Sequence, residues 1–188
     1  MHNDFAKGHY TTRSGRLLAW GDLDLVEIKN LGDIVIFKNV CPVAGPMQEG
    51  ALYYPKFIYE DVHKNIWVSE SQSIVRLNGN SFKRYQFDIA DRSPQYIRSF
   101  SIFEDLKHNL YVTSFQGNIF KYNPQRDQFE IQSEKFPHEV EYTGTTRDHN
   151  IFIGAAKGLY ESELLKDGGF SKPKLIFNTP YVSYVTKL

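Results

Sequence analysis

An internal repeat constrains the fold of this sequence more than any other feature. Residues 58–69 read I-Y-E-D-V-H-K-N-I-W-V-S, and residues 102–113 read I-F-E-D-L-K-H-N-L-Y-V-T. The two copies match position by position, and Asn65 and Asn109 are 44 residues apart. A similarity that returns at a period of this length indicates a structure built from repeated units.

Each unit contains four predicted strands. A third copy of the motif surrounds Asn150, 41 residues after Asn109, and a weaker copy lies at residues 13–20. One strand precedes each motif turn, a second follows it, and two more come after further turns rich in Gly, Asn and Asp. Four antiparallel strands in every 40–50 residues, roughly, is the spacing of β-propeller blades.

We therefore predict an all-β protein, a β-propeller of about four four-stranded antiparallel blades. The strand after the motif turn is apolar at consecutive positions, which is expected where both faces of a sheet are covered. Helical repeats would instead place apolar residues at i, i+3, i+4 and i+7, a pattern that this sequence lacks. The expected blades are residues 8–40, 55–88, 96–133 and 139–178.

The end of the chain resembles the start of a further blade. Residues 180–188 are similar to the strands that open the units at 58 and 102, but no motif turn follows them. We expect the chain to be an incomplete portion of a larger propeller, because an uncovered terminal blade is a liability that a complete protein would manage. The alternative is that this strand closes the ring on the first blade, where residues 8–12 already form an opening strand.

Composition argues against some classes of partner. Lys and Arg number 22, Asp and Glu also number 22, and the formal net charge is zero, so we expect no nucleic-acid partner. No secretory signal opens the chain, and no apolar run approaches about 18 residues, so we expect no membrane contact by this segment. The single cysteine, Cys41, is interpreted as a small packed side chain.

The repeated stretch E-D-x-x-x-N-[IL]-[WY]-V-[ST] resembles the two-component regulator propeller repeat, whose pattern is roughly E-D-x-x-G-N-[IL]-W-[IV]-G-T. The similarity is good over residues 57–162, although Lys64, His108 and His149 stand where that pattern has glycine. The resemblance implies a periplasmic sensor propeller of a membrane-bound hybrid histidine kinase, of the kind through which Bacteroidetes respond to polysaccharide fragments. The residues that fit the pattern are Glu60, Asp61, Asn65, Ile66, Trp67, Val68, Glu104, Asp105, Asn109, Leu110, Tyr111, Val112, Thr113, Asn150, Ile151, Phe152, Ile153, Gly154, Gly158, Leu159 and Tyr160.

The histidines and carboxylates of the motif are interpreted as structural. His63, His108 and His149 lie in turns of different blades with no metal-ligand spacing, and histidine is favoured where a turn requires positive φ. The pairs 60–61 and 104–105 recur with the blade, which a catalytic carboxylate pair rarely does. We therefore expect each Asp to accept hydrogen bonds from backbone N–H groups of its own turn.

The repeated aromatic residues are predicted to pack between blades, rather than to form a platform for sugar rings. They are Trp20, Trp67, Tyr111 and Phe152, which the repeat places at equivalent positions.

Residues that depart from the repeat are the better candidates for ligand binding. They are Tyr142, Arg147 and Asp148. No catalytic, metal or cofactor motif occurs, so we predict a non-catalytic ligand-sensing propeller, with a carbohydrate or other parts of the parent protein as partners. The alternatives are a stand-alone scaffold for protein–protein interaction and a propeller glycosidase or lyase.

Overall fold

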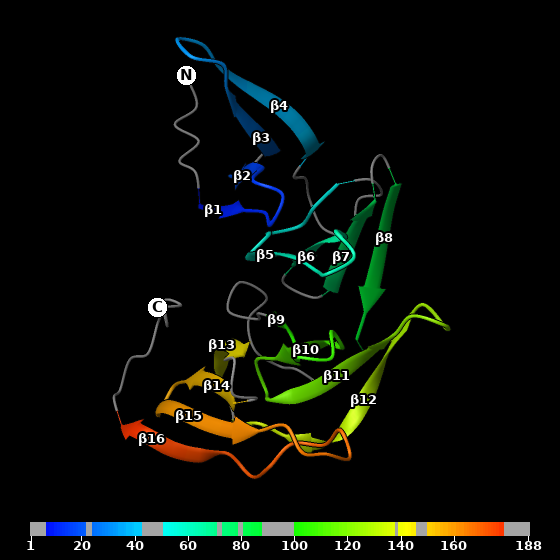
Figure 1. Cartoon of the computed structure of the whole chain (residues 1–188), viewed down its shortest axis with the longest axis vertical. Coiled ribbons are helices and arrows are strands. Elements are labelled where there is room, and N and C mark those ends of the chain that lie inside the picture. Colours follow the sequence, from blue (N-terminus) through cyan, green and yellow to red (C-terminus); the bar gives the residue numbers. More distant parts are fainter. Residues whose placement is uncertain are drawn as a thin grey trace. The chain divides into compact units, whose positions relative to one another are not determined.

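A computed structural model describes residues 7–21, 24–42, 51–70, 73–78, 81–87, 100–137, 139–145 and 150–178. The described residues form four antiparallel sheets of four strands each, with no helix among them (Figure 1). In every sheet the strands follow one another in sequence order, so each sheet is a meander. This confirms the predicted all-β fold of four four-stranded blades.

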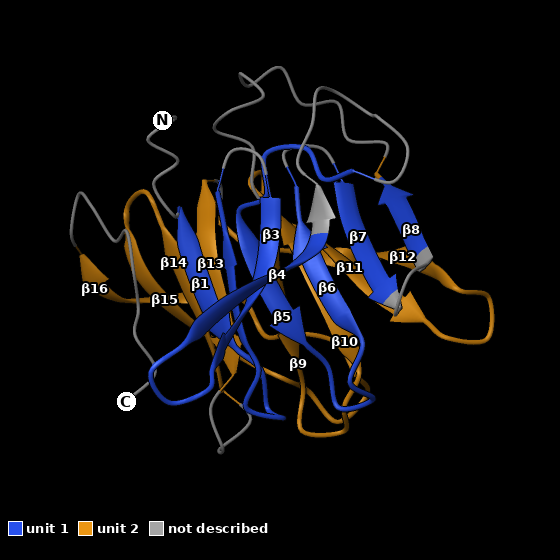
Figure 2. Ribbon diagram, turned by 90° about the horizontal axis from the view of Figure 1, so that it is seen from above, with its two compact units in different colours: residues 1–86 blue, residues 87–188 orange. Residues whose placement is uncertain are grey.

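The first two sheets lie in one compact unit, Met1–Gln86, and the last two in a second, Phe87–Leu188 (Figure 2). The strands of the first unit are β1 (Gly8–Thr11), β2 (Leu17–Trp20), β3 (Asp24–Asn30), β4 (Val35–Pro42), β5 (Phe57–Glu60), β6 (Ile66–Ser69), β7 (Ser73–Asn78) and β8 (Ser81–Gln86). Those of the second unit are β9 (Phe100–Glu104), β10 (Leu110–Ser114), β11 (Asn118–Asn123), β12 (Gln128–Lys135), β13 (Val140–Thr145), β14 (Asn150–Ala155), β15 (Gly158–Glu163) and β16 (Lys174–Asn178).

An apolar cluster joins the two sheets of the first unit. One face of β2 packs against the second sheet, and burial of these side chains is the main favourable term in the fold of the unit. The sheets also approach each other through their first strands, β1 and β5. The buried members of the cluster are Leu18, Trp20, Leu25, Leu52, Ile58, Ile66, Val68, Val75 and Leu77.

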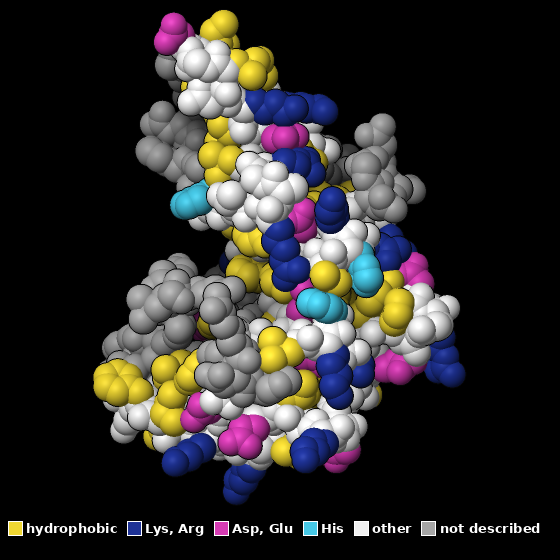
Figure 3. Space-filling model, in the orientation of Figure 1, with side chains coloured by type: hydrophobic (Ala, Val, Ile, Leu, Met, Phe, Trp, Pro, Cys, Tyr) yellow, Lys and Arg dark blue, Asp and Glu magenta, His cyan; other side chains and the backbone are white. Residues whose placement is uncertain are grey.

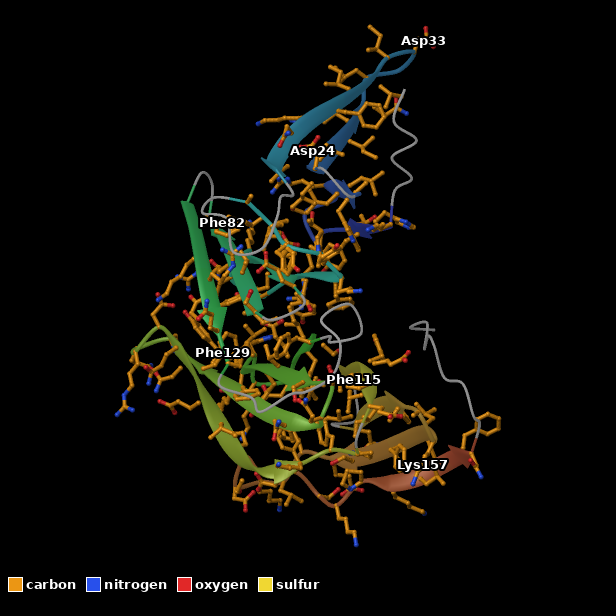
Figure 4. All side chains as sticks on the ribbon, turned by 180° about the vertical axis from the view of Figure 1, so that it is seen from behind. Asp24, Asp33, Phe82, Phe115, Phe129 and Lys157 are labelled. Atoms are coloured by element: carbon orange, nitrogen blue, oxygen red, sulfur yellow. The ribbon has the colours of Figure 1, made fainter. Side chains whose placement is uncertain are left out.

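A second cluster joins the two sheets of the other unit and is richer in aromatic rings. Phe103 stacks on Tyr111 with ring centroids 5.2 Å apart, and Phe170 meets both rings edge-on. In the first unit, Asp33 lies at the tip of the β3–β4 hairpin (Figure 4). The buried members are Phe103, Tyr111, Ile119, Phe136, Val140, Ile151, Ile153 and Phe170.

Two of the strands that follow a motif turn, β6 and β10, are covered on both faces, as predicted. Every residue of β6 and β10 is buried. Trp67 and Tyr111 are fully buried and Phe152 is half-buried. Of these, Tyr111 belongs to the cluster that joins the two sheets of its unit, as expected for packing between blades.

Trp20 does not occupy the position that the sequence analysis assigned to it. Gly8 pairs with Trp20 in the first sheet, and Phe57 pairs with Ser69 in the second, so Trp20 corresponds to Ser69. Leu18 is the residue that corresponds to Trp67 by the same register. The error arose because Trp20 was matched by residue type, whereas the hydrogen-bonded register fixes the position.

Three expectations fall on residues that the structure does not describe. The strand expected at 180–188 lies outside the described residues, as does His149. The backbone of Cys41 belongs to β4, but its side chain lies outside the described set.

Candidate functional site

In the two motifs whose turns the structure describes, the aspartate is bound within its own turn, as predicted. Asp61 accepts hydrogen bonds from the backbone N–H of Asn65 at 2.8 Å, from the Asn65 side chain at 2.8 Å and from the Trp67 indole at 2.7 Å. Asp105 accepts the same two bonds from Asn109 at 2.8 and 2.7 Å. These buried carboxylates therefore have a structural function in the turn.

The first blade builds the same turn with a different residue. The Thr12 backbone N–H donates to the Arg16 carbonyl, just as the Asp61 N–H donates to the Asn65 carbonyl. The Thr12 hydroxyl also accepts a hydrogen bond from the Arg16 N–H at 2.9 Å. Thr12 is buried, like the aspartates. A threonine hydroxyl thus replaces the carboxylate, which explains why the first copy is weak in sequence.

The glutamate of the motif joins neighbouring blades. Glu60 is buried, and its carboxylate accepts hydrogen bonds from the backbone N–H of Arg13 and, at 3.4 Å, from the Ser14 hydroxyl. The Glu60 backbone N–H in turn donates to the Tyr10 hydroxyl oxygen at 3.1 Å. Pairing across the blade junction is a role that the repeat alone did not reveal.

The turn histidine fits its structural interpretation. His108 has φ of 62° and Lys64 has φ of 66°, so both residues adopt the left-handed conformation that the related repeats give to glycine. In the part of the chain that the structure describes, no group of three or more His, Cys, Asp or Glu side chains could hold a metal ion.

Only one of the three predicted ligand-binding residues lies in the described structure. Tyr142 lies on β13, half-buried, and burial raises the pKa of its hydroxyl. Its ring covers Gly144, where a Cβ atom would lie 2.6 Å from the tyrosine oxygen. Arg147 and Asp148 lie outside the described residues.

A different group of residues gathers where the first strands of the first unit begin. Lys7 directly precedes β1, and its backbone N–H donates to the Trp20 carbonyl at 2.8 Å. Lys56 directly precedes β5, and its backbone N–H donates to the Ser69 carbonyl at 2.8 Å. The two lysines therefore occupy equivalent positions at the same end of neighbouring strands.

An exposed aromatic ring lies beside these lysines. The Lys7 ammonium is 5.7 Å from the centre of the Tyr54 ring, a cation–π distance, and Tyr54 is 46% exposed. Tyr54 also has φ of 47°, the left-handed region that a residue with a Cβ rarely adopts. We call Lys7, Tyr54 and Lys56 the Tyr54 cluster.

A buried ion pair holds the segment that carries this ring. Glu70 is 1% exposed, and it receives two hydrogen bonds from the Arg84 guanidinium, at 2.9 and 3.0 Å. The same carboxylate accepts the Tyr53 backbone N–H at 2.7 Å, and Arg84 also donates to the Ala51 carbonyl at 2.6 Å. Residues 51 to 53 are therefore fixed to the second blade immediately before Tyr54.

Two of the three residues of the Tyr54 cluster are lysines. Burial lowers the pKa of Lys56 below its ordinary value, and the charge of Lys7 lowers it further. On the face shown in Figure 3, basic side chains lie interspersed with acidic ones. Two cations beside an exposed ring can bind a flat or cyclic ligand that carries negative charge.

The sequence matches no family model and no curated protein. Solved structures do match. One is the extracellular domain of a protein named as a one-component system of Bacteroides thetaiotaomicron, with 14% identity, a TM-score of 0.62, and coverage of 90% of this chain and 25% of that one. Another, from the same organism, is the extracellular domain of a protein named as a hybrid two-component system, with 15% identity, a TM-score of 0.60, and coverage of 87% and 22%.

The chain is built of β-propeller blades. The expected likeness to the propellers of two-component sensors is confirmed at the level of the fold. A virginiamycin B lyase from Staphylococcus aureus matches as well, with 12% identity, a TM-score of 0.64, and coverage of 96% of this chain and 58% of the lyase. This chain therefore spans little more than half of the lyase and about a quarter of each sensor domain.

Sequence reasoning did not find the Tyr54 cluster, because its residues lie outside the repeated motif. A signal was nevertheless present. Tyr53-Tyr54 stands between two blades, and Lys7 and Lys56 each stand one residue before a predicted opening strand. A comparison of the segments between the repeats, rather than of the repeats themselves, would have singled these residues out.

Proposed function

We propose that this chain is a ligand-sensing portion of a β-propeller, and that it binds an oligosaccharide at the Tyr54 cluster without catalysing a reaction on it. The observation that carries the proposal is the exposed Tyr54 ring beside Lys7, on a segment held by the buried Glu70–Arg84 pair. An aromatic ring offers an apolar face to a sugar, and a rigid segment reduces the ordering cost of binding.

The setting that we propose is the extracytoplasmic sensor of a two-component signalling protein. The repeat resemblance and the fold likeness to extracellular sensor domains support it. The described part of the chain contains no helix that could span a membrane. The carboxylates of the motif, which a glycosidase would need free for chemistry, are engaged in turns and blade junctions.

The test is a binding measurement on a matched pair of variants. Tyr54→Ala is expected to weaken oligosaccharide binding about tenfold, which is the scale of one aromatic contact. Phe37→Ala removes a ring that is 65% exposed on β4 of the same unit, and it is expected to leave binding unchanged. Isothermal titration calorimetry with a panel of neutral and acidic oligosaccharides reports both. Equal binding by the two variants would contradict the proposed site.

A further inference from the structure

The first sheet carries a second apolar face, opposite the one that packs on the second sheet. Leu17, Ile28 and Phe37 are register partners on β2, β3 and β4, so their side chains lie on one face. Successive residues of a strand point to opposite faces, so this face is turned away from Leu18, which belongs to the cluster with the second sheet. Phe37 is 65% exposed, and Leu17 and Ile28 are half-buried. An exposed apolar face of this kind indicates a contact surface.

The same positions are covered in the second sheet. Their counterparts there are Ile66, Leu77 and Phe82, by the strand register that aligns the two sheets. Ile66 and Leu77 are each 7% exposed and belong to the cluster with the first sheet, against which Phe82 also packs. This is the face that a blade turns to the preceding blade. The first sheet therefore has the apolar residues that receive a preceding blade.

The last sheet carries an apolar face of the other kind. Phe152 lies two residues before Gly154, Gly154 pairs with Leu159, and Leu159 pairs with Phe177, so the four residues lie on one face. Ile153 points the opposite way, into the cluster with the third sheet. Phe177 is 62% exposed, and Phe152 and Leu159 are half-buried.

The equivalent residues of the third sheet face the following blade. The repeat equates Tyr111 with Phe152, and the strand register equates Ile119 with Leu159. Tyr111 and Ile119 are 0% exposed and belong to the cluster that joins the third sheet to the last. The last sheet therefore carries, partly exposed, the face that a blade turns to the blade after it.

A threonine of the first sheet matches a hydrogen bond that joins two blades elsewhere in the chain. The Thr145 hydroxyl donates to the Glu104 carbonyl at 2.8 Å, across the junction of the third and last sheets. Thr145 ends β13 and pairs with Ile151, and Thr11 ends β1 and pairs with Leu17, so the two threonines occupy equivalent positions. Thr11 is exposed. The first sheet thus presents both the polar and the apolar parts of a blade junction.

We name the two surfaces by their residues. The first open face consists of Thr11, Leu17, Ile28 and Phe37, and the last open face consists of Phe152, Leu159 and Phe177.

We propose that two copies of this chain associate, with the last open face of each copy packed against the first open face of the other. The two faces are the two halves of one kind of junction, which the chain already makes once within each unit. A second copy supplies both halves. Because the two faces differ, the contact is heterologous, and a two-fold axis repeats it once. Two copies of four sheets contribute eight blades, which is within the range of about four to eight in propellers.

The experiment is sedimentation equilibrium on the 188-residue chain over a wide range of protein concentration. A reversible equilibrium between one chain and two is expected. Phe37→Asp and Phe177→Asp are each expected to raise the dissociation constant at least about thirtyfold, because each places a charge at an apolar position of the contact. Both rings are mostly exposed within one chain, so the variants are expected to keep the far-ultraviolet circular dichroism of the native chain.

The matched control is Leu31→Asp. Leu31 is 62% exposed, like the two phenylalanines, but it lies in the turn between β3 and β4 and not on either open face. Its substitution is expected to leave the dissociation constant unchanged.

A mixing experiment tests which face meets which. The Phe37→Asp chain keeps its last open face intact, and the Phe177→Asp chain keeps its first open face intact. A mixture of the two variants is expected to associate more tightly than either variant alone, because one of the two contacts is then formed by unaltered faces. If the first open face bound a second copy of itself, the Phe177→Asp chain would dimerise alone and mixing would add nothing.

Each other outcome contradicts the proposal. A single chain at every concentration would show that a second copy does not cover these faces. A dimer that persists in both phenylalanine variants, or that Leu31→Asp dissociates equally, would place the contact elsewhere. Assemblies that grow beyond two copies would overturn the two-fold pairing.

Discussion

At the scale of single residues, the backbone conformation of the motif turn leads to a stability prediction. Lys64 is exposed and has φ of 66°. Lys64→Gly is expected to raise the free energy of unfolding by about 0.5–1 kcal/mol. The left-handed conformation costs a residue with a Cβ about 1–2 kcal/mol, and glycine does not pay this cost. Part of the gain is offset because glycine loses more backbone entropy on folding. Urea unfolding measures the change.

A control variant separates the relief of strain in the turn from the general effect of introducing a glycine. Lys83→Gly places the same substitution in the extended strand β8, where it is expected to lower the free energy of unfolding by about 0.5–1 kcal/mol. A loss of stability in Lys64→Gly would show that the left-handed turn is not strained.

The residue scale also shows what sequence reasoning could and could not predict. The hydrogen bonds of Asp61 and Asp105 were predictable, since a repeated Asp before a turn has a local function. The equivalent function of Thr12 was not, because a hydroxyl that replaces a carboxylate erases the sequence signal and keeps the hydrogen bond. The register of Trp20 required the strand pairing itself.

At the scale of elements, the segment before β5 depends on an ion pair that crosses the second blade. Glu70 and Arg84 are 1% and 13% exposed, and the backbone of residues 51–53 bonds to both. Arg84→Met is expected to lower the free energy of unfolding by about 3 kcal/mol or more, because it leaves a buried carboxylate without its partner. Hydrogen exchange at the Tyr53 amide should accelerate in the same variant.

The matched control is Arg16→Met in the same unit. Arg16 pairs with Glu27 at 3.2 Å, but the arginine is 42% exposed, so its loss is expected to cost no more than about 1 kcal/mol. Equal losses in the two arginine variants, measured by urea unfolding, would contradict the importance assigned to the buried pair.

The strands themselves followed from the repeat, its apolar runs and its turn residues, whereas this segment did not. No periodicity marks residues 51–56, and the carboxylate that holds them comes from position 70 and its arginine from position 84. Contacts between an irregular segment and distant residues carry no local sequence pattern. The candidate site was missed for this reason, although the blades that carry it were predicted.

At the scale of the whole molecule, the repeat determined the fold class without determining the function. Propellers of this fold include extracellular sensor domains and a lyase, and the structural likeness to them is at 12–15% identity. The distinction between a sensor and an enzyme therefore depends on single residues rather than on the fold.

The most direct test of binding without catalysis is to measure both binding and chemical change on the same sugar. The chain is incubated to equilibrium with the oligosaccharide that it binds most tightly in calorimetry, and the sugar is then recovered and its mass measured. The account predicts saturable binding that Tyr54→Ala weakens, together with a sugar of unchanged mass. A product of altered mass that appears with the native chain, and not with heat-denatured chain, would contradict it and identify an enzyme.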